Sequence, residues 1–225
     1  MEARYYYKFD MSSITDDLHA MREHYDQPPL RRADLHASPF IQFSKWLEDA
    51  VKAEIYDPNA CSLATVDGQG QPVSRAVLLK ALENEQFVFY TNYNSRKATH
   101  LSGNNQACMH FPWFALQRQV IATGRVEKID ATQAEEYFAS RPLESRLGAW
   151  ASAQSHEVDS RESLEKSYLE MQEKFGDNPP KPPHWGGFAM VPQTIEFWQG
   201  GPGRLHDRFM YRLEKGEWTI QRLNP

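Results

Sequence analysis

The chain has 225 residues, of which 40% are hydrophobic, and its six Trp, ten Tyr and twelve Phe are typical of a packed globular protein. The formal net charge of −5 argues against a general nucleic-acid binder, which normally displays a basic surface. The apolar runs are far shorter than the ~20 residues of a membrane helix, and the first residues lack the layout of a secretory signal. We therefore expect a cytoplasmic protein without a membrane partner.

One domain over residues 1–225 is the default expectation at this length. It divides into a helical N-terminal segment (1–56), barrel strands (57–130), helices (131–178) and closing strands (185–225). Cys61 and Cys108 are the only cysteines and lie in apolar alternating stretches, where a free thiol commonly acts as a small buried hydrophobe. Neither has a second Cys or a His at ligand spacing, so we expect no metal site.

Two helices are predicted in the N-terminal segment. Residues 12–25 open with Ser and Thr and carry acidic residues early, which suits a helix N-terminus. Residues 38–55 place apolar side chains three and four apart, with Ser38 as cap and Pro39 at the first position. A proline-bearing connector separates the two.

From Ala60 the apolar period changes to two. "CSLATV", the turn "DGQG" and "PVSRAVLLK" predict a hairpin, and three further segments up to residue 129 continue the pattern, for about five strands. Antiparallel strands at this spacing usually close into a barrel or sandwich. The fold class is therefore mainly β with flanking helices.

A short helix interrupts the strands at "NSRKATHLSGNN", with Asn94 or Ser95 as cap. Arg96 and Lys97 occupy its first turn, where basic residues oppose the helix dipole unless they share an anion with the free backbone N–H groups. We interpret them as phosphate ligands; solubilising charge is the alternative.

A helix corner follows the strands. Thr132 with Glu135 forms a capping-box pattern, and Pro142 ends this helix near Arg141 and starts the next one. Tyr137, Arg141 and Ser145 then converge at a helix N-terminus, which gives either an anion pocket or a simple capped corner.

The tail predicts four strands, "GGFAMV", "TIEFWQG", "RLHDRFMYRL" and "EWTIQRL". In an extended "GGPGRLHDRF", Arg204, His206 and Arg208 would point to one side. This row is either a ligand-binding face or an ordinary solvated strand edge. The common phosphate-loop, dinucleotide, serine-hydrolase and zinc-protease motifs are absent from the sequence.

Several stretches together resemble one family. "RAVLLK", "FYTNYNSRKA", "RQV", "YFASRP", "GAWASAQS", "IEFWQGG", "RLHDR" and a terminal "RLNP" are similar, in the same order from about Met21 to Pro225, to pyridoxine (pyridoxamine) 5'-phosphate oxidases. The resemblance implies a homodimeric FMN-binding split β-barrel with FMN at the subunit interface. It also implies oxidation of pyridoxine or pyridoxamine 5'-phosphate to pyridoxal 5'-phosphate, with O2 reduced to H2O2.

The resemblance also carries residue roles. It implies flavin contacts from Arg75, Ala76, Val77, Leu78, Leu79, Lys80, Tyr90, Thr91, Arg96, Lys97, Gln119, Gln154, Ser155, Trp198 and Arg208. It implies a substrate site made by Arg22, Tyr25, Lys80, Tyr137, Arg141, Ser145, Arg204, Leu205 and His206. Arg204 and His206 would face the vitamin ring as catalytic residues together with Asp57, for which a turn or cap is the alternative.

Two departures and two alternative functions remain. His24 occupies a variable position, and Arg146 follows Ser145 where a neutral amide is common, so either could alter the lid or the phosphate site; the extension before Ile14 matches nothing. The alternatives are another flavin split-barrel oxidoreductase that uses a nicotinamide donor, and a non-catalytic flavin or pyridoxal-phosphate binding protein.

Overall fold

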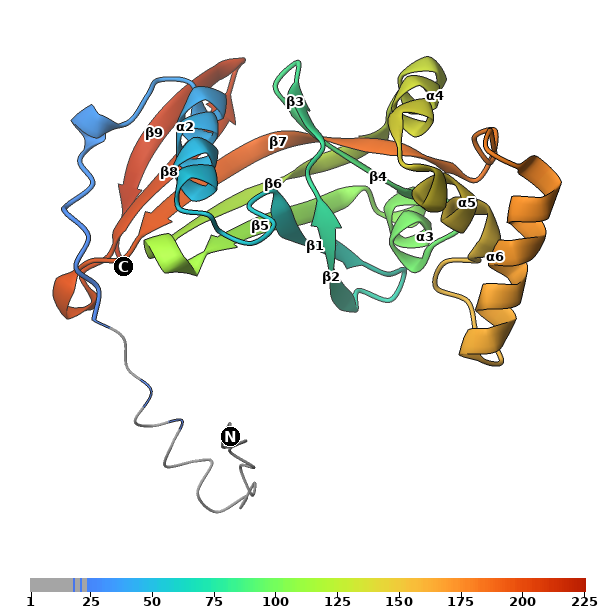
Figure 1. Ribbon diagram of the computed structural model, residues 1–225. Coiled ribbons are helices and arrows are strands. Elements are labelled where there is room, and N and C mark those ends of the chain that lie inside the picture. Colours follow the sequence, from blue (N-terminus) through green and yellow to red (C-terminus); the bar gives the residue numbers. More distant parts are fainter. Residues whose placement is uncertain (1–17, 19–20, 22–23) are drawn as a thin grey trace, which may run out of the picture.

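The computed structural model describes Leu18, Met21 and residues 24–225 (Figure 1). The helix predicted over residues 12–25 therefore lies almost entirely outside the described residues. From His24 to Arg31 the chain forms neither helix nor strand. No helix in the described residues is long and apolar enough to cross a membrane.

Nine strands form one antiparallel sheet in the order β2-β1-β5-β6-β7-β4-β3, and β8 and β9 extend it from β7. The strands are β1 Ala60–Val66, β2 Pro72–Leu78, β3 Ala81–Glu83, β4 Gln86–Asn92, β5 Gln106–Trp113, β6 Arg118–Lys128, β7 Trp185–Gln199, β8 Asp207–Glu214 and β9 Glu217–Leu223.

Strand β7 organises the sheet. The sequence predicted two separate segments here, but the structure has one strand of 15 residues. Its first half pairs with β4 and its second half with β8, while β6 runs along the other edge over nearly the whole length. A bulge between Thr123 and Gly124 bends this pair. A Cβ on Gly124 would collide with the Val191 carbonyl, so glycine is required there.

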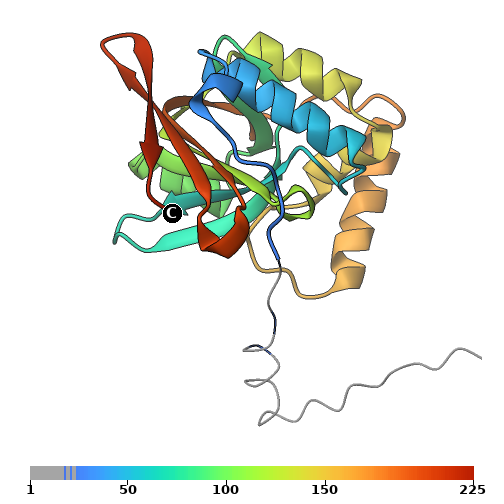
Figure 2. The same cartoon turned by 90° about the vertical axis from the view of Figure 1, so that its left-hand side faces the viewer.

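The prediction of about five strands up to residue 129 is one short. After β2 the backbone breaks pairing with β1, the Leu79 N–H donates to Asn59 O, and the Lys80 N–H donates to Val88 O of β4. The short strand β3 then pairs with β4. This crossing from one edge of the sheet to the other curls it into a partly closed barrel (Figure 2).

Helix α2 (Pro39–Lys52) packs on the sheet and fills its core, with Ser38 as cap and Pro39 first, as predicted. The Phe43 ring lies 5.0 Å from Phe87 and 4.9 Å from Phe111, edge to face in both cases. Cys61 is also buried in this core, and burial raises the pKa of its thiol to about 12. Cys61 and Cys108 are both free.

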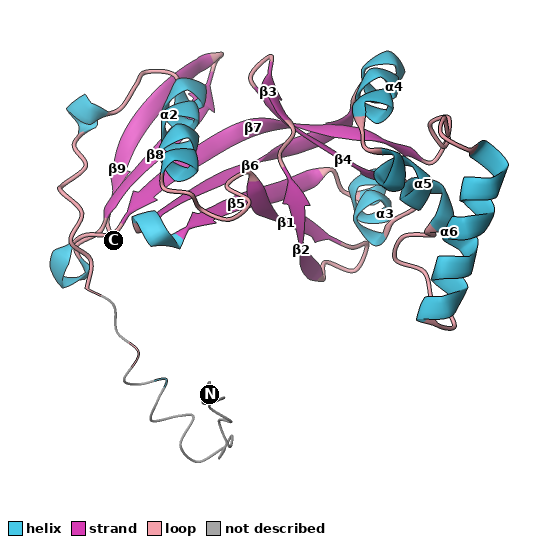
Figure 3. Cartoon of the chain, in the orientation of Figure 1, coloured by secondary structure: helices cyan, strands magenta, loops and turns pink. Residues whose placement is uncertain are grey.

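The remaining helices gather at one end of the sheet, away from β8 and β9 (Figure 3). They are α3 Arg96–Gly103, α4 Ala131–Ser140, α5 Leu143–Ala151 and α6 Arg161–Phe175; short 3-10 turns lie at η1 Arg32–Asp34, η2 Phe114–Leu116 and η3 Pro202–Arg204. The predicted Thr132 cap of α4 is wrong by two residues. The Asp130 carboxylate accepts from the Thr132 N–H and caps the helix instead.

The predicted single row of Arg204, His206 and Arg208 is also wrong. Strand β8 begins only at Asp207, because Pro202 and Gly203 turn the chain through η3. Arg204 has a left-handed backbone with φ of 65°. Of the three side chains, only Arg208 therefore projects from a strand.

Candidate active site

A cleft of about 420 Å³ opens between β4 and the α4–α5 corner; we call it the corner cleft. Its lining combines cationic, phenolic and hydroxyl groups with one indole. The lining residues are Leu78, Lys80, Tyr90, Thr91, Asn92, Tyr137, Arg141, Ser145, Gly148, Ala149, Ser152, Gln154 and Trp185.

Arg141 is the main cation of the corner cleft. Pro142 forces it out of helical geometry, so α4 ends at Ser140 and Arg141 has ψ of 149°. Its guanidinium lies 4.7 Å from the centre of the Trp185 ring. Burial lowers its pKa, and its Nη1 is buried without a hydrogen-bond partner in the described chain. A planar cation with an unsatisfied donor is suited to an anionic oxygen.

Stacked aromatic rings support this arginine. Tyr137, one turn before Arg141, stacks on Tyr90 of β4 at 3.9 Å with an interplanar angle of 14°. Tyr90 in turn lies 5.4 Å from Trp185, nearly parallel to it. Burial raises the pKa of Tyr90 to about 12, so its hydroxyl stays protonated and neutral near neutral pH.

Ser145 lies in the first turn of α5 and Lys80 lies between β2 and β3, so both reach the corner cleft from other elements. Arg146, by contrast, turns away: its Nη2 donates to the Asp177 carbonyl at 3.3 Å and its Nη1 to Asn178 Oδ1 at 3.5 Å. Arg146 therefore ties α5 to the connector after α6 and does not line the corner cleft.

Lys97 lies beside the corner cleft and is only 7% exposed. Its ammonium group donates to three neutral oxygens: Thr91 Oγ1 at 2.9 Å, Gln154 Oε1 at 2.9 Å and Ser95 Oγ at 3.1 Å. Burial, and secondly the charge of Arg75, lowers its pKa to about 8. Ser95 is thus the backbone cap of α3, but its hydroxyl serves the lysine rather than the helix.

The side chain of Arg75 in β2 is held by hydrogen bonds to the neighbouring strand β1. Its Nη1 donates to Leu63 O at 2.9 Å and to Thr65 Oγ1 at 2.7 Å, and the Thr65 hydroxyl lies 3.1 Å from His100 Nδ1. The Thr65 hydroxyl therefore connects Arg75 with His100. Burial, and secondly the charge of Arg96, lowers the pKa of Arg75.

Arg75, Arg96 and Lys97 form what we call the cationic cluster. None of the ion pairs in the described residues involves any of the three. Burial is the main cause of the lowered pKa values of Arg75 and Lys97, and the charge of Arg96 adds to the first shift and that of Arg75 to the second. Such a donor set, charged and without a carboxylate partner, fits a phosphate group.

A second group of predicted residues forms around Trp198 near the end of β7. The Tyr25 ring lies 5.8 Å from Trp198 and 5.0 Å from His206, edge-on to both, and the Trp198 and His206 rings are 4.7 Å apart. We call these three rings the aromatic cluster. Tyr25, Gln119 and Trp198 also line a cleft of about 650 Å³ with residues of the η2 turn.

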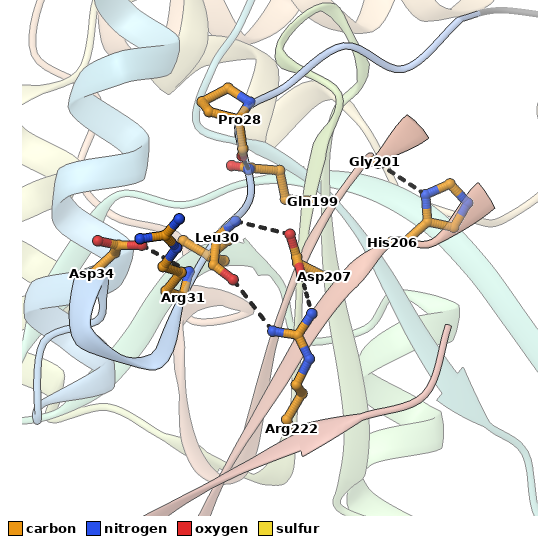
Figure 4. Close-up of polar contacts among 9 residues, drawn as sticks. All are labelled: Pro28, Leu30, Arg31, Asp34, Gln199, Gly201, His206, Asp207 and Arg222. Carbon is orange, nitrogen blue, oxygen red and sulfur yellow. Dashed lines mark hydrogen bonds and ion pairs between the residues drawn. The ribbon is translucent and has the colours of Figure 1, made fainter. Parts of the chain in front are cut away.

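The His206 imidazole is fixed by its backbone neighbours. Its Nδ1 accepts from the Gly201 N–H at 3.2 Å (Figure 4), which leaves Nε2 directed elsewhere. Burial, then the charge of Arg204, lowers its pKa, with Asp207 opposing. Arg204 and Leu205 are exposed beside it.

Arg208 is occupied by an internal partner. Its Nε and Nη2 donate to the two carboxylate oxygens of Glu196 at 2.7 and 3.1 Å, and its Nη1 donates to the Asn224 carbonyl at 3.1 Å. Glu196 raises its pKa. Any flavin contact of Arg208, as the sequence predicts, would have to coexist with its pairing to Glu196. The sequence prediction missed this partner.

The other predicted residues are scattered. Val77 and Leu79 point into the core, whereas Ala76 and Leu78 lie on the opposite face of β2. Asp57 has φ of 47°, and its carbonyl accepts the Ala60 N–H in a turn. Ser155 is exposed with φ of 73°, and Gln119 Oε1 lies 2.9 Å from His110 Nε2. Arg22 lies outside the described residues.

The two groups do not meet within one chain. The corner cleft and the cationic cluster are carried mainly by β2, β4, α3, α4 and α5, whereas the aromatic cluster is formed by Tyr25, the end of β7 and the turn before β8, at the opposite end of the sheet (Figure 1). A site that uses both groups needs two copies of the chain.

Residues that the sequence prediction missed include Trp185, Asn92 and Ser152 of the corner cleft. Trp185 precedes "GG" at the start of β7, where Gly186 lets the Tyr93 ring approach the backbone. An aromatic residue followed by two glycines is a weak sequence signal for a ring that packs closely beside a strand. No sequence signal marks Asn92 or Ser152 as residues of the cleft.

Comparison with known proteins identifies the family of the chain. The family model described as pyridoxamine 5'-phosphate oxidase matches residues 47–175, and the model of the pyridoxine 5'-phosphate oxidase C-terminal dimerisation region matches residues 185–225. A pyridoxine/pyridoxamine 5'-phosphate oxidase of Cupriavidus necator is 50% identical over 206 residues, 91% of this chain and 97% of the relative. That of Photobacterium profundum is 50% identical over 210 residues, 93% and 100%.

Solved structures share the fold. PhzG from Burkholderia lata, in complex with tetrahydrophenazine-1-carboxylic acid, superposes with a TM-score of 0.84 at 26% identity, covering 90% of this chain and all of the other. A pyridoxamine 5'-phosphate oxidase-related FMN binding protein of Nostoc punctiforme gives 0.68 at 19%, covering 85% and 100%.

The curled sheet with its flanking helices is thus a split β-barrel, and the class is that of the split-barrel oxidases. Within this class, the chain belongs to the pyridoxine/pyridoxamine 5'-phosphate oxidase family. The family and the fold class that the sequence motifs predicted are confirmed.

Proposed function

We propose that this protein is an FMN-dependent oxidase that converts pyridoxine or pyridoxamine 5'-phosphate to pyridoxal 5'-phosphate. The observation that carries the proposal is the presence of two separate anion-binding sets, the cationic cluster and the corner cleft with Arg141. Two phosphate esters, one on the flavin and one on the vitamin, would use them. The relatives' names support the substrate.

The chain's own residues account for binding. The cationic cluster would hold the FMN phosphate, with Thr91 and Gln154 orienting Lys97. Arg141, with Lys80, Tyr137 and Ser145, would hold the substrate phosphate at the corner. Bound FMN would supply the acceptor for the hydride that leaves the 4' carbon, and O2 the final acceptor, yielding H2O2.

Orientation is the main contribution of the protein, because hydride transfer requires a close and aligned donor carbon. His206, with Nδ1 fixed by Gly201, would present Nε2 to a substituent of the vitamin ring. Arg204 would cover the ring with its planar cation. Since these residues lie opposite the corner cleft, we propose a homodimer whose two chains share each site; the match to a C-terminal dimerisation region supports it.

The test uses the purified protein. We expect a yellow protein that releases FMN on denaturation and that consumes O2 and forms an aldehyde with pyridoxine 5'-phosphate under air. FMN without O2 uptake would instead favour a reductase or a carrier protein. A protein that binds no flavin would refute the proposal.

A further inference from the structure

The segment His24–Arg31, which we call the strap, carries Tyr25 to the aromatic cluster although it has no secondary structure of its own. Two side chains from distant parts of the chain hold the backbone of its first half. Gln117 donates to the His24 carbonyl and accepts from the Asp26 N–H, and Gln199 donates to the Pro28 carbonyl at 2.8 Å. The strap is thus fixed to the sheet by groups outside itself.

The strongest of these attachments lies at Leu30. The Asp207 carboxylate accepts from the Leu30 N–H at 2.8 Å and pairs through its other oxygen with Arg222 of β9, which donates to the Leu30 carbonyl at 3.4 Å (Figure 4). Both backbone polar groups of one strap residue are therefore bound by a single ion pair. The Leu30 side chain is buried beneath it.

Asp207 also links this attachment to the site along the chain. It is the first residue of β8 and is buried, and His206 directly precedes it in the turn that leads into the strand. The Tyr25 ring packs against His206 and Trp198, and a Cβ on Gly200 would collide with it. The position of Tyr25 is therefore defined by the end of β7 and by the turn before β8, next to the residue that binds the strap.

We propose that Asp207 and Arg222 are positioning residues that hold the strap so that Tyr25 completes the substrate wall at His206. The inference rests on the proposed function for the role of Tyr25 toward substrate, but the holding of the strap does not. Neither residue lines the corner cleft or the cleft at Trp198. Loss of the ion pair should therefore weaken substrate binding and leave FMN binding intact.

The experiment compares D207N and R222Q with R161Q, which removes an exposed ion pair on α6, far from the strap in sequence. In the FMN-loaded protein, hydrogen exchange of residues 24–31 should be about tenfold faster in D207N and R222Q and unchanged in R161Q. KM for pyridoxine 5'-phosphate should rise about fivefold or more, with kcat and the FMN Kd within about twofold of wild type. R222K should recover part of the loss.

The outcomes separate the two claims. Unchanged exchange of the strap in both variants would overturn the proposal whatever the activity. Faster exchange with unchanged KM would overturn it too, because the contact of Tyr25 with substrate would then not depend on the strap. An equal loss of FMN affinity would also overturn it, because the damage would then be general. If D207N does not fold, R222Q and R222K decide alone. A wild-type protein without oxidase activity would refute the proposed function, and the exchange data would still decide whether the ion pair holds the strap.

Discussion

At the scale of single residues, the informative groups are cations buried among neutral partners. Lys97 and Arg75 are held by hydroxyl, amide and carbonyl oxygens, and burial lowers the pKa of each side chain. A buried cation is costly unless it is paired. The sequence motif identified these residues, but only the structure shows that Thr65, His100 and Gln154 set their positions, since those three come from separate elements.

Lys97 gives a prediction about pH. Its pKa of about 8 lies below the ordinary 10.5, so above pH ~8 the ligand-free protein must take up a proton before the lysine can pair with a phosphate. We expect the FMN Kd to increase from pH 7 to pH 9, by at most about tenfold per unit. Riboflavin, which lacks the phosphate, should bind independently of pH over this range, as should FMN to K97R. Flavin fluorescence titration measures all three.

The same lysine makes the stability of the protein depend on pH. Between about pH 8 and 10.5 the unfolded chain binds the proton that the folded chain has lost. The contribution of Lys97 to the free energy of unfolding therefore becomes more favourable as pH rises through this window. A K97M comparison in urea at pH 7 and pH 9 isolates this contribution, and an equal difference at both pH values would contradict it.

Arg141 gives a prediction about substrate choice. R141A removes the buried guanidinium that faces the corner cleft, so kcat/KM for pyridoxine 5'-phosphate should fall roughly 100-fold, as expected for a charged hydrogen-bonded contact. Activity with unphosphorylated pyridoxine should change less than about threefold. R146A serves as the matched control because that arginine points to Asp177 and Asn178. Equal losses on both substrates would place Arg141 outside the phosphate site.

At the scale of elements, the structures that depend on local sequence were predicted well. Helix α2 with its Ser38 cap, the β1–β2 hairpin and the α4–α5 break at Pro142 all follow from capping, turn and proline rules. Long-range pairing was not predictable. Nothing local indicates that β7 is one strand that changes partners from β4 to β8, or that β8 starts only after η3.

The bulge of β6 against β7 gives a prediction about stability. In G124A the new Cβ would meet the Val191 carbonyl and the Pro192 backbone, neither of which can move cheaply within the sheet. We expect a loss of about 2 kcal/mol in the free energy of unfolding, measured in urea. G103A is the control, because no atom lies within 4 Å of its Cβ, and it should stay within about 0.5 kcal/mol of wild type.

At the scale of the whole molecule, the two groups of site residues lie at opposite ends of the sheet (Figure 1). The sequence motifs include most members of both groups. They could not show the separation, because distance across a sheet depends on strand order rather than on sequence spacing. The proposed two-chain site would bring the two groups together.

A mixing experiment tests the two-chain site. R141A and H206A should each be strongly impaired alone. After joint unfolding and refolding at equal amounts, half of the dimers pair one variant with the other, and each such hybrid carries one site with both native residues and one with neither. Activity should recover to about a quarter of wild type. No recovery, with dimers present, would show that each chain carries a complete site.

The attachment of the strap has a consequence for biosynthesis. Leu30 and Asp207 are 177 residues apart, so the strap leaves the ribosome long before the strand that receives it exists. Its anchoring must wait until β8 and β9 have been translated and paired. Nascent and truncated chains that end before β8 therefore lack the ion pair that holds the strap.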